Sequence, residues 1–300
     1  MRKYVVAVAF VVIAACAANV RPVAASQLID RNATDVTLAV NAKGEAMMTY
    51  KVNGKLKHVL AWGAVNAIPP TADGNQVAFK LDYSGGYGKY HVNDYWATGG
   101  FKCAPYTGPQ LAWAVAACTA PDGSYWALQA WQRGLPDYGV TPTAPQAAWE
   151  LHLSHWTGAL PVLSISEDWA YRKYDALYGT LTYNGTGVYG FHSTPSGAPL
   201  DSFGRVVYVD TYDSSYGPGW RRENSFLTHD PKGSFCYGFY PHGAFTAGTG
   251  TKYRATVEGP GVAPDVMWEA PAPGAYNATA EAAAAASLKA LGDPACVAHV

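Results

Sequence analysis

Hydrophobic and polar positions alternate in short runs along most of the chain, and glycine, proline or asparagine separates the runs. Two such runs flank Asn53-Gly54 and two more flank Asn184-Gly185, and Asn-Gly is the strongest short-range signal for a hairpin. The first hairpin belongs to a predicted three-stranded meander from Asp35 to Trp62. This period of two predicts antiparallel sheets rather than long helices.

Further runs rich in Tyr, Trp, Val and Thr predict the remaining strands. We expect them at 76–83, 124–132, 149–156, 160–166, 205–212, 220–229, 234–240 and 251–257. A segment with three prolines, 136–145, is expected to be a surface loop or a divider between halves. The predicted fold class is mainly β: an antiparallel β-sandwich or barrel-like stack with a C-terminal α-helix.

Alanine dominates 280–291, which predicts the one long helix. We expect Thr279 to cap its start and Gly292 to end it, and we favour a docked helix over a flexible alanine-rich tail. The predicted organisation is a β-rich globular domain over 26–276, followed by the helix and a disulfide-tethered tail over 277–300.

The amino terminus has the layout of a secretory signal peptide. The basic pair Arg2-Lys3 precedes an apolar run over 4–15, and Val23-Ala24-Ala25 offers a cleavage site before Ser26. We therefore expect residues 1–25 to be removed and the protein to be secreted or otherwise extracytoplasmic.

A lipid anchor is the alternative for the same segment. Ile13-Ala14-Ala15-Cys16 fits the pattern cut by lipoprotein signal peptidase, which would leave a lipid-modified Cys16 at the new terminus. No later stretch is apolar enough to span a bilayer, so no transmembrane segment is expected.

Four cysteines follow this segment, and an even number in an exported chain predicts two disulfides. Three pairings are possible, and we favour Cys103–Cys118 together with Cys236–Cys296. No pair has C-x-x-C spacing, which argues against a zinc site built from cysteines.

The low charge of the chain limits its partners. Only 14% of residues are charged, against about 25% in an average domain. No basic stripe is present, so nucleic acid is not an expected partner, and no cofactor is predicted. The composition favours a neutral ligand, such as a carbohydrate or a cell-envelope polymer.

Aromatic residues are in surplus, with ten Trp and 21 Tyr. In the strand predicted at 124–132, Trp126 lies on one face and Trp131 on the other. Either that strand is covered on both sides or one set of rings is exposed. An exposed platform containing Trp126 and Trp131 would suit sugar rings.

A polar patch is predicted around a third hairpin. Asp230-Pro231-Lys232-Gly233 has the residue preferences of a type I turn with a bulge, which pairs residue 228 with 236 and residue 222 with 242. One sheet face would then carry four polar ligand-binding candidates: Arg222, Asn224, Tyr240 and His242. The alternative is that these groups pair with one another at a wet sheet edge.

Sequence motifs for catalysis or metal binding are missing. His152 and His155 alternate along a strand to opposite faces, so we expect no metal site built on this pair. For an extracytoplasmic hydrolase, Glu223 with Asp210 is the best carboxylate pair that the sequence offers. The predicted function is an exported, disulfide-bonded β protein that binds a neutral ligand. The alternatives are the hydrolase and a structural surface protein without a small ligand.

Overall fold

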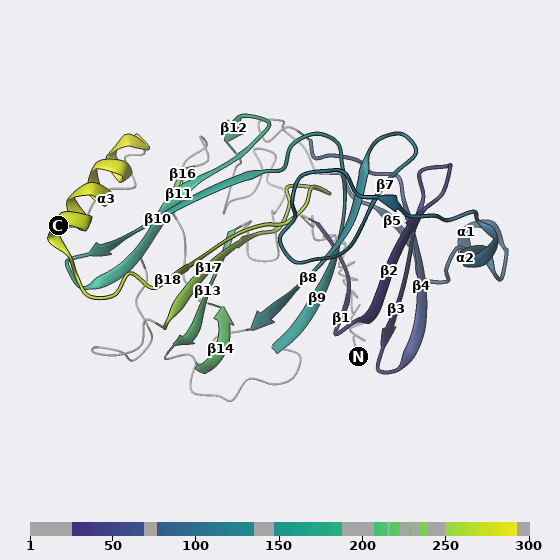
Figure 1. The fold of residues 1–300 in the computed structure, drawn as a ribbon, viewed down its shortest axis with the longest axis horizontal. Helices are drawn as coiled ribbons and strands as arrows, with labels where there is room; N and C mark the ends of the chain where they lie inside the picture. Colours follow the sequence, from purple (N-terminus) through teal and green to yellow (C-terminus); the bar gives the residue numbers. More distant parts are fainter. Residues whose placement is uncertain are drawn as a thin grey trace, which may run out of the picture.

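The computed structural model describes residues 26–68, 77–134, 147–187, 207–214, 217–222, 228–229, 234–238 and 250–292. Antiparallel strands within these ranges form four sheets, and a helix lies at the C-terminal end (Figure 1). The prediction of a mainly antiparallel β protein with a C-terminal helix is therefore confirmed. The predicted signal peptide, 1–25, lies outside the described residues.

Two sheets pack together in the first half of the chain. Sheet I has the strand order β1 (Gln27–Arg31), β9 (Ala147–Trp156), β8 (Tyr125–Gly134), β7 (Ala114–Thr119) and β6 (Ala104–Pro105). Sheet II has the order β2 (Thr34–Val40), β3 (Ala46–Val52), β4 (Lys55–Trp62) and β5 (Lys80–Asp82). Their facing side chains form one apolar core, to which Met48 and Val59 contribute from sheet II and Trp126 and Leu153 from sheet I.

The other two sheets form a second packed pair. Sheet III has the order β10 (Val162–Ala170), β11 (Tyr174–Tyr183), β16 (Ser234–Gly238) and β15 (Thr228–His229), with β12 (Thr186–Gly187) paired to β11. Sheet IV has the order β14 (Gly217–Arg222), β13 (Val207–Ser214), β17 (Lys252–Val257) and β18 (Val266–Pro271). Leu177 and Leu181 of sheet III pack on Val209 and Ala255 of sheet IV.

The connection between β17 and β18, residues 258–265, joins the two pairs of sheets. It lies against the face of sheet I that points away from sheet II, where Gln129 donates a 2.8 Å hydrogen bond to the carbonyl of Asp265. The backbone N–H of His155 donates to the carbonyl of Val262 at 2.9 Å. Sheet I is thus covered on both faces.

The turn chemistry of the sequence predicts several strand junctions correctly. Asn53 and Gly54 both have positive φ, as do Asn184 and Gly185, which is the requirement of a type I′ hairpin. The pairing of residue 228 with residue 236 is also found as predicted. The strand predicted over 220–229 is wrong, however, because β14 ends at Arg222 in sheet IV and β15 belongs to sheet III.

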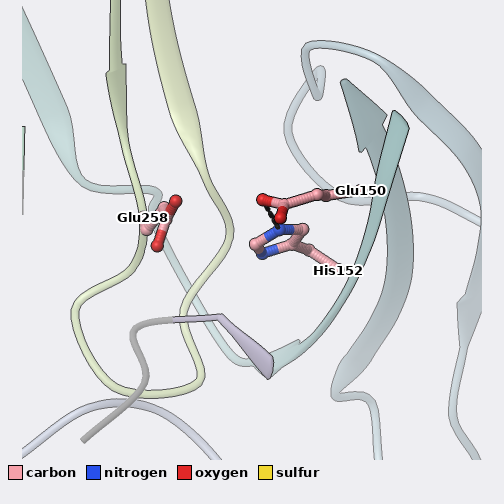
Figure 2. A group of neighbouring side chains, drawn as sticks. All are labelled: Glu150, His152 and Glu258. Atoms are coloured by element: carbon pink, nitrogen blue, oxygen red, sulfur yellow. Dashed lines mark ion pairs between the residues drawn. The ribbon is translucent and has the colours of Figure 1, made fainter. Parts of the chain in front are cut away.

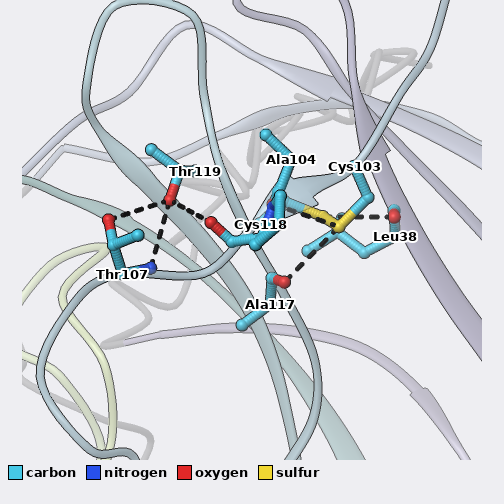
Figure 3. Close-up of a disulfide and its surroundings, with 8 residues drawn as sticks. Leu38, Cys103, Ala104, Thr107, Ala117, Cys118 and Thr119 are labelled. Atoms are coloured by element: carbon cyan, nitrogen blue, oxygen red, sulfur yellow. Dashed lines mark hydrogen bonds between the residues drawn. A yellow bond between two sulfur atoms is a disulfide. The ribbon is translucent and has the colours of Figure 1, made fainter.

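A disulfide joins Cys103 to Cys118, as predicted (Figure 3). Cys118 is fully buried on β7, and its sulfur lies 3.3 Å from the carbonyl oxygen of Leu38 on β2. The bridge therefore fixes the segment before β6 to the core between sheets I and II. Cys296 lies outside the described residues, so the Cys236–Cys296 bridge stays a prediction.

Helix α3 (Ala278–Ala290) docks on sheet III, as predicted. Its cap is Asn277, whose side chain accepts hydrogen bonds from the backbone N–H groups of Thr279 and Ala280, so the predicted cap at Thr279 is wrong. The carboxylate of Glu281 accepts the N–H of Trp169 at 3.0 Å. Two shorter helices, α1 (Tyr87–Tyr90) and α2 (Tyr95–Thr98), follow β5. Among the described residues, no helix has the length and apolar character needed to cross a bilayer.

The docking of α3 should depend on pH through Asp168. Burial, and then the negative charge of Glu281, raise the pKa of Asp168 to about 6. A folded-state pKa above the unfolded value of about 3.9 means that the stability linked to this proton is present at low pH and is lost as pH rises through about 6. Asp168→Asn removes this penalty. We expect it to raise the free energy of unfolding at pH 7 by about 1–2 kcal/mol, with little effect at pH 4.

Urea unfolding of the wild type and the variant across this pH range measures the difference. The exposed variant Asp94→Asn serves as the control, because its side chain makes no capping hydrogen bond. A destabilised Asp168→Asn protein at neutral pH would show that the carboxylate is stabilised by its surroundings, contrary to the expectation.

Candidate metal centre

Three side chains converge where sheet I meets the connection between β17 and β18. Glu150 and His152 point from the same face of β9, and Glu258 faces them from the connection (Figure 2). One ligand atom from each residue lies within 4.8 Å of the other two. Glu150 and His152 are buried, whereas Glu258 is half-buried.

The period of the strand explains the first two positions. Residues 150 and 152 share one face of β9, while Leu151 and Leu153 point into the core between sheets I and II. Arg31 of β1 binds Glu150 Oε1 through Nε and through its terminal nitrogen, both at 2.9 Å. The other oxygen, Oε2, lies 3.6 Å from His152 Nε2. Arg31 thus orients the carboxylate of Glu150 toward the imidazole.

Among the described residues, the imidazole of His152 is hydrogen-bonded through Nδ1, while its Nε2 has the longer ion-pair contact with Glu150. Its Nδ1 lies 2.9 Å from Ser26 Oγ, and that hydroxyl donates a short hydrogen bond to Asp265 Oδ1. Its Nε2 is buried and has no hydrogen-bond partner among the described residues. Such an anchor on Nδ1 sets the tautomer in which Nε2 carries the lone pair, which is how proteins usually present a histidine to a metal.

Asp265, which lies next to His152, is held in place by several hydrogen bonds. Its Oδ2 accepts a 3.0 Å hydrogen bond from Trp131 Nε1, and its Oδ1 accepts the N–H of Gly259 at 3.2 Å. Gln129 bonds both backbone groups of the same residue. Burial raises the pKa of Asp265 above its ordinary value, although His152, Ser26 and Trp131 oppose the rise.

The electrostatics of the group favour a positive charge. Burial alone would lower the pKa of His152, but Asp265, Glu150 and Glu258 outweigh it and raise the pKa to about 9. Burial raises the pKa of Glu258 to about 7; His152 and Arg222 oppose this rise, while Asp265 and Glu150 add to it. The metal-free group therefore holds protons at positions that a divalent cation would take instead.

The donor set suits a transition-metal ion better than calcium. Calcium takes six to eight oxygen ligands, whereas one imidazole and two carboxylates match the ligands of zinc and its neighbours. In a tetrahedral zinc site, ligand atoms about 2.0–2.2 Å from the ion lie roughly 3.3 Å apart. Glu150 and His152 are already close to this spacing. Glu258, on a connection and half-buried, is the group that must move inward.

The prediction that Trp126 and Trp131 form an exposed aromatic platform is wrong. Trp126 and Trp131 are fully buried. Trp126 packs in the core and stacks on His155, while Trp131 donates to Asp265 behind the candidate centre. Both faces of β8 are covered, so neither ring reaches solvent. Trp149, with 53% of its surface exposed, is the accessible tryptophan on β9.

The predicted polar patch is only partly within the described residues. Asn224, Tyr240 and His242 lie outside them, so their role in binding stays a prediction. Arg222 is buried in sheet IV, where it pairs with Asp210 of β13. The predicted pairing of residue 222 with residue 242 lies outside the described residues and stays a prediction. Asp210 accepts hydrogen bonds from Arg222 and Arg254, and its predicted partner Glu223 lies outside the described residues, so the hydrolase pair stays a prediction.

Two of the three candidate ligands, Glu150 and His152, form a pattern that can be recognised in the sequence. His152 and His155 do occupy opposite faces, as predicted, and His155 bonds Ser124 and the carbonyl of Ala64. The signal that was missed is Glu150-x-His152, two potential ligands on one strand face. Glu258 and Asp265 lie more than a hundred positions further along the chain, and no local pattern marks them as partners.

No known protein family, curated protein or solved structure matches this chain.

Proposed function

We propose that this chain works outside the cytoplasm as a β protein that binds a divalent transition-metal ion through Glu150, His152 and Glu258. The observation that carries the proposal is the buried Nε2 of His152, which lacks a hydrogen-bond partner among the described residues and faces two carboxylates. A buried polar atom without a partner is costly. A metal ion would satisfy it and would also neutralise the two carboxylates.

The extracytoplasmic location rests on two features. Disulfides persist mainly in oxidising compartments, and Cys103–Cys118 is such a bond. The signal-peptide pattern of residues 1–25 supports the same location. Both features agree with the predicted exported protein.

Zinc titration of the metal-free protein tests the proposed centre. We expect one zinc ion per chain, bound at least about 100-fold more weakly by Glu258→Gln, because even removal of a supporting outer group typically costs 10–100-fold. Zinc at 100 times its dissociation constant should also raise the free energy of unfolding by about 2.7 kcal/mol. Calorimetry and thermal unfolding measure these two quantities.

Glu269→Gln is the matched control for this titration. Glu269 lies on β18, is exposed, and forms an ion pair with Lys252 at 3.5 Å. It should bind zinc like the wild type. Equal zinc affinity of the wild type and Glu258→Gln would refute the centre and would point to adventitious binding at surface histidines such as His91.

Our second proposal is that the protein binds a neutral polymer through exposed aromatic residues other than Trp126 and Trp131. Tyr83, Tyr87 and Trp96 are exposed in the segment that follows β5, and Trp96 stacks on His58 at 4.8 Å between ring centroids. Exposed aromatic rings of this kind suit carbohydrate. A glycan and peptidoglycan pull-down should retain the wild type but lose Trp96→Ala; equal retention of both proteins would refute this surface.

A further inference from the structure

Ser26 is buried although it is the first residue of the described chain. Only 1% of its surface is exposed, and its hydroxyl lies between Asp265 Oδ1 and His152 Nδ1. The ends of folded domains are usually exposed and poorly ordered unless specific contacts hold them. Ser26 therefore has specific contacts that would hold it in place if it became a chain end.

The sequence marks the same residue as the first of the processed protein. Val23-Ala24-Ala25 has the small residues that signal peptidases require directly before the cut. In this hydrolysis, water attacks the carbonyl carbon of Ala25 and the bond to the nitrogen of Ser26 breaks. Ala25 keeps the oxygen of water as a carboxylate, and Ser26 gains an α-amino group that is protonated at neutral pH.

We propose that cleavage occurs between Ala25 and Ser26, and that the new α-ammonium group forms a buried ion pair with Asp265. The nitrogen of Ser26 is three bonds from Oγ, so the two atoms are separated by at most about 4 Å. Because Oγ already contacts Asp265, the ammonium group would form close to the same carboxylate.

The groups around Asp265 include several carboxylates that a cation would stabilise. Trp131 from β8 and Gly259 from the connection give it neutral hydrogen bonds, and His152 from β9 lies 3.5 Å away. The carboxylates of Glu150 and Glu258 lie near the same histidine. A fixed positive charge would stabilise this cluster of three carboxylates, which the neutral amide of an uncut chain cannot do.

The inference distinguishes the two predicted routes of export. Cleavage before Cys16 would leave the nitrogen of Ser26 in a peptide bond and would remove any basis for the ion pair. Export of the full chain with its own leader, followed by mass and N-terminal analysis, should give a protein that begins at Ser26. A lipid-modified Cys16, or a cut at another bond, would overturn the inference.

A pair of purified proteins tests the ion pair itself. One begins at Ser26 and the other keeps Ala25, and both are studied with a chelator so that metal plays no part. The chain that begins at Ser26 should unfold at a temperature at least about 4 °C higher.

Asp265→Asn in both proteins should abolish the difference, and equal unfolding temperatures of the two unsubstituted proteins would overturn the ion pair. A chemical probe applies even if Asp265→Asn does not fold. Periodate oxidises an N-terminal serine at its amino alcohol, and the buried Ser26 should react at least about tenfold more slowly in the folded chain than in denaturant. Equal rates in the folded and denatured chains would also overturn the inference.

Discussion

Asp210→Asn should lower the free energy of unfolding by about 3–5 kcal/mol, the usual cost of removing one partner from a buried ion pair. Asp210 is fully buried in the middle of sheet IV, directly opposite Arg222 on β14 and Arg254 on β17. Its Oδ1 accepts from Arg222 Nε at 3.3 Å, and its Oδ2 accepts from two nitrogens of Arg254 at 3.1 and 2.8 Å. The variant would leave two buried guanidinium groups without their anion.

The effect should extend beyond sheet IV. Arg254 also donates a 2.8 Å hydrogen bond to the carbonyl of Gln132 on β8, so it links sheet IV to sheet I. Urea unfolding of the variant measures the loss, with the exposed Asp94→Asn as a control that should change stability by less than about 0.5 kcal/mol. An Asp210→Asn protein as stable as this control would show that the two arginines do not need the carboxylate.

Opening the Cys103–Cys118 disulfide should cost about 3 kcal/mol, because the bond closes a loop of 15 residues in the unfolded chain. The double variant Cys103→Ser, Cys118→Ala keeps a small apolar side chain at the buried position and a polar one at the exposed position. The loss should appear as a lower urea midpoint at unchanged slope.

Reduction of the wild-type protein provides a second measurement of how much this disulfide contributes to the free energy of unfolding. Dithiothreitol should lower the urea midpoint of the wild type at least as much as the double substitution lowers it. Any loss that dithiothreitol causes in the double variant cannot come from the Cys103–Cys118 bridge, which that variant lacks. A double variant as stable as the oxidised wild type would contradict a stabilising role for this bridge.

Local chemistry accounts for the parts of the fold that the sequence predicts well. The Asn-Gly turns at Asn53 and Asn184 specify their hairpins because both central residues take positive φ. Strands β1 and β18 have no Asn-Gly turn beside them and are not predicted; β7 is not predicted either, although the turn at 120–124 joins it to β8. The run 220–229 looks continuous in sequence, yet its two ends pair in different sheets. Partner choice between sheets is set by long-range packing, which a local pattern does not contain.

The candidate site was less predictable for the same reason. Burial of Trp126 and Trp131 depends on sheet II and on the connection 258–265, both distant in sequence. The composition alone cannot distinguish a covered ring from an exposed one. The ligands of the centre come from two separate parts of the chain, β9 and that connection, and Ser26 supports His152 from a third. Only the alternation of Glu150 and His152 could have indicated it.

Anomalous diffraction at the zinc absorption edge tests the central claim most directly. Crystals of the zinc-loaded protein should show one peak about 2.0–2.2 Å from Nε2 of His152 and from one carboxylate oxygen of each of Glu150 and Glu258. A zinc-loaded protein with no peak at these three residues, or with peaks only at exposed side chains such as His91, would contradict the proposed metal centre.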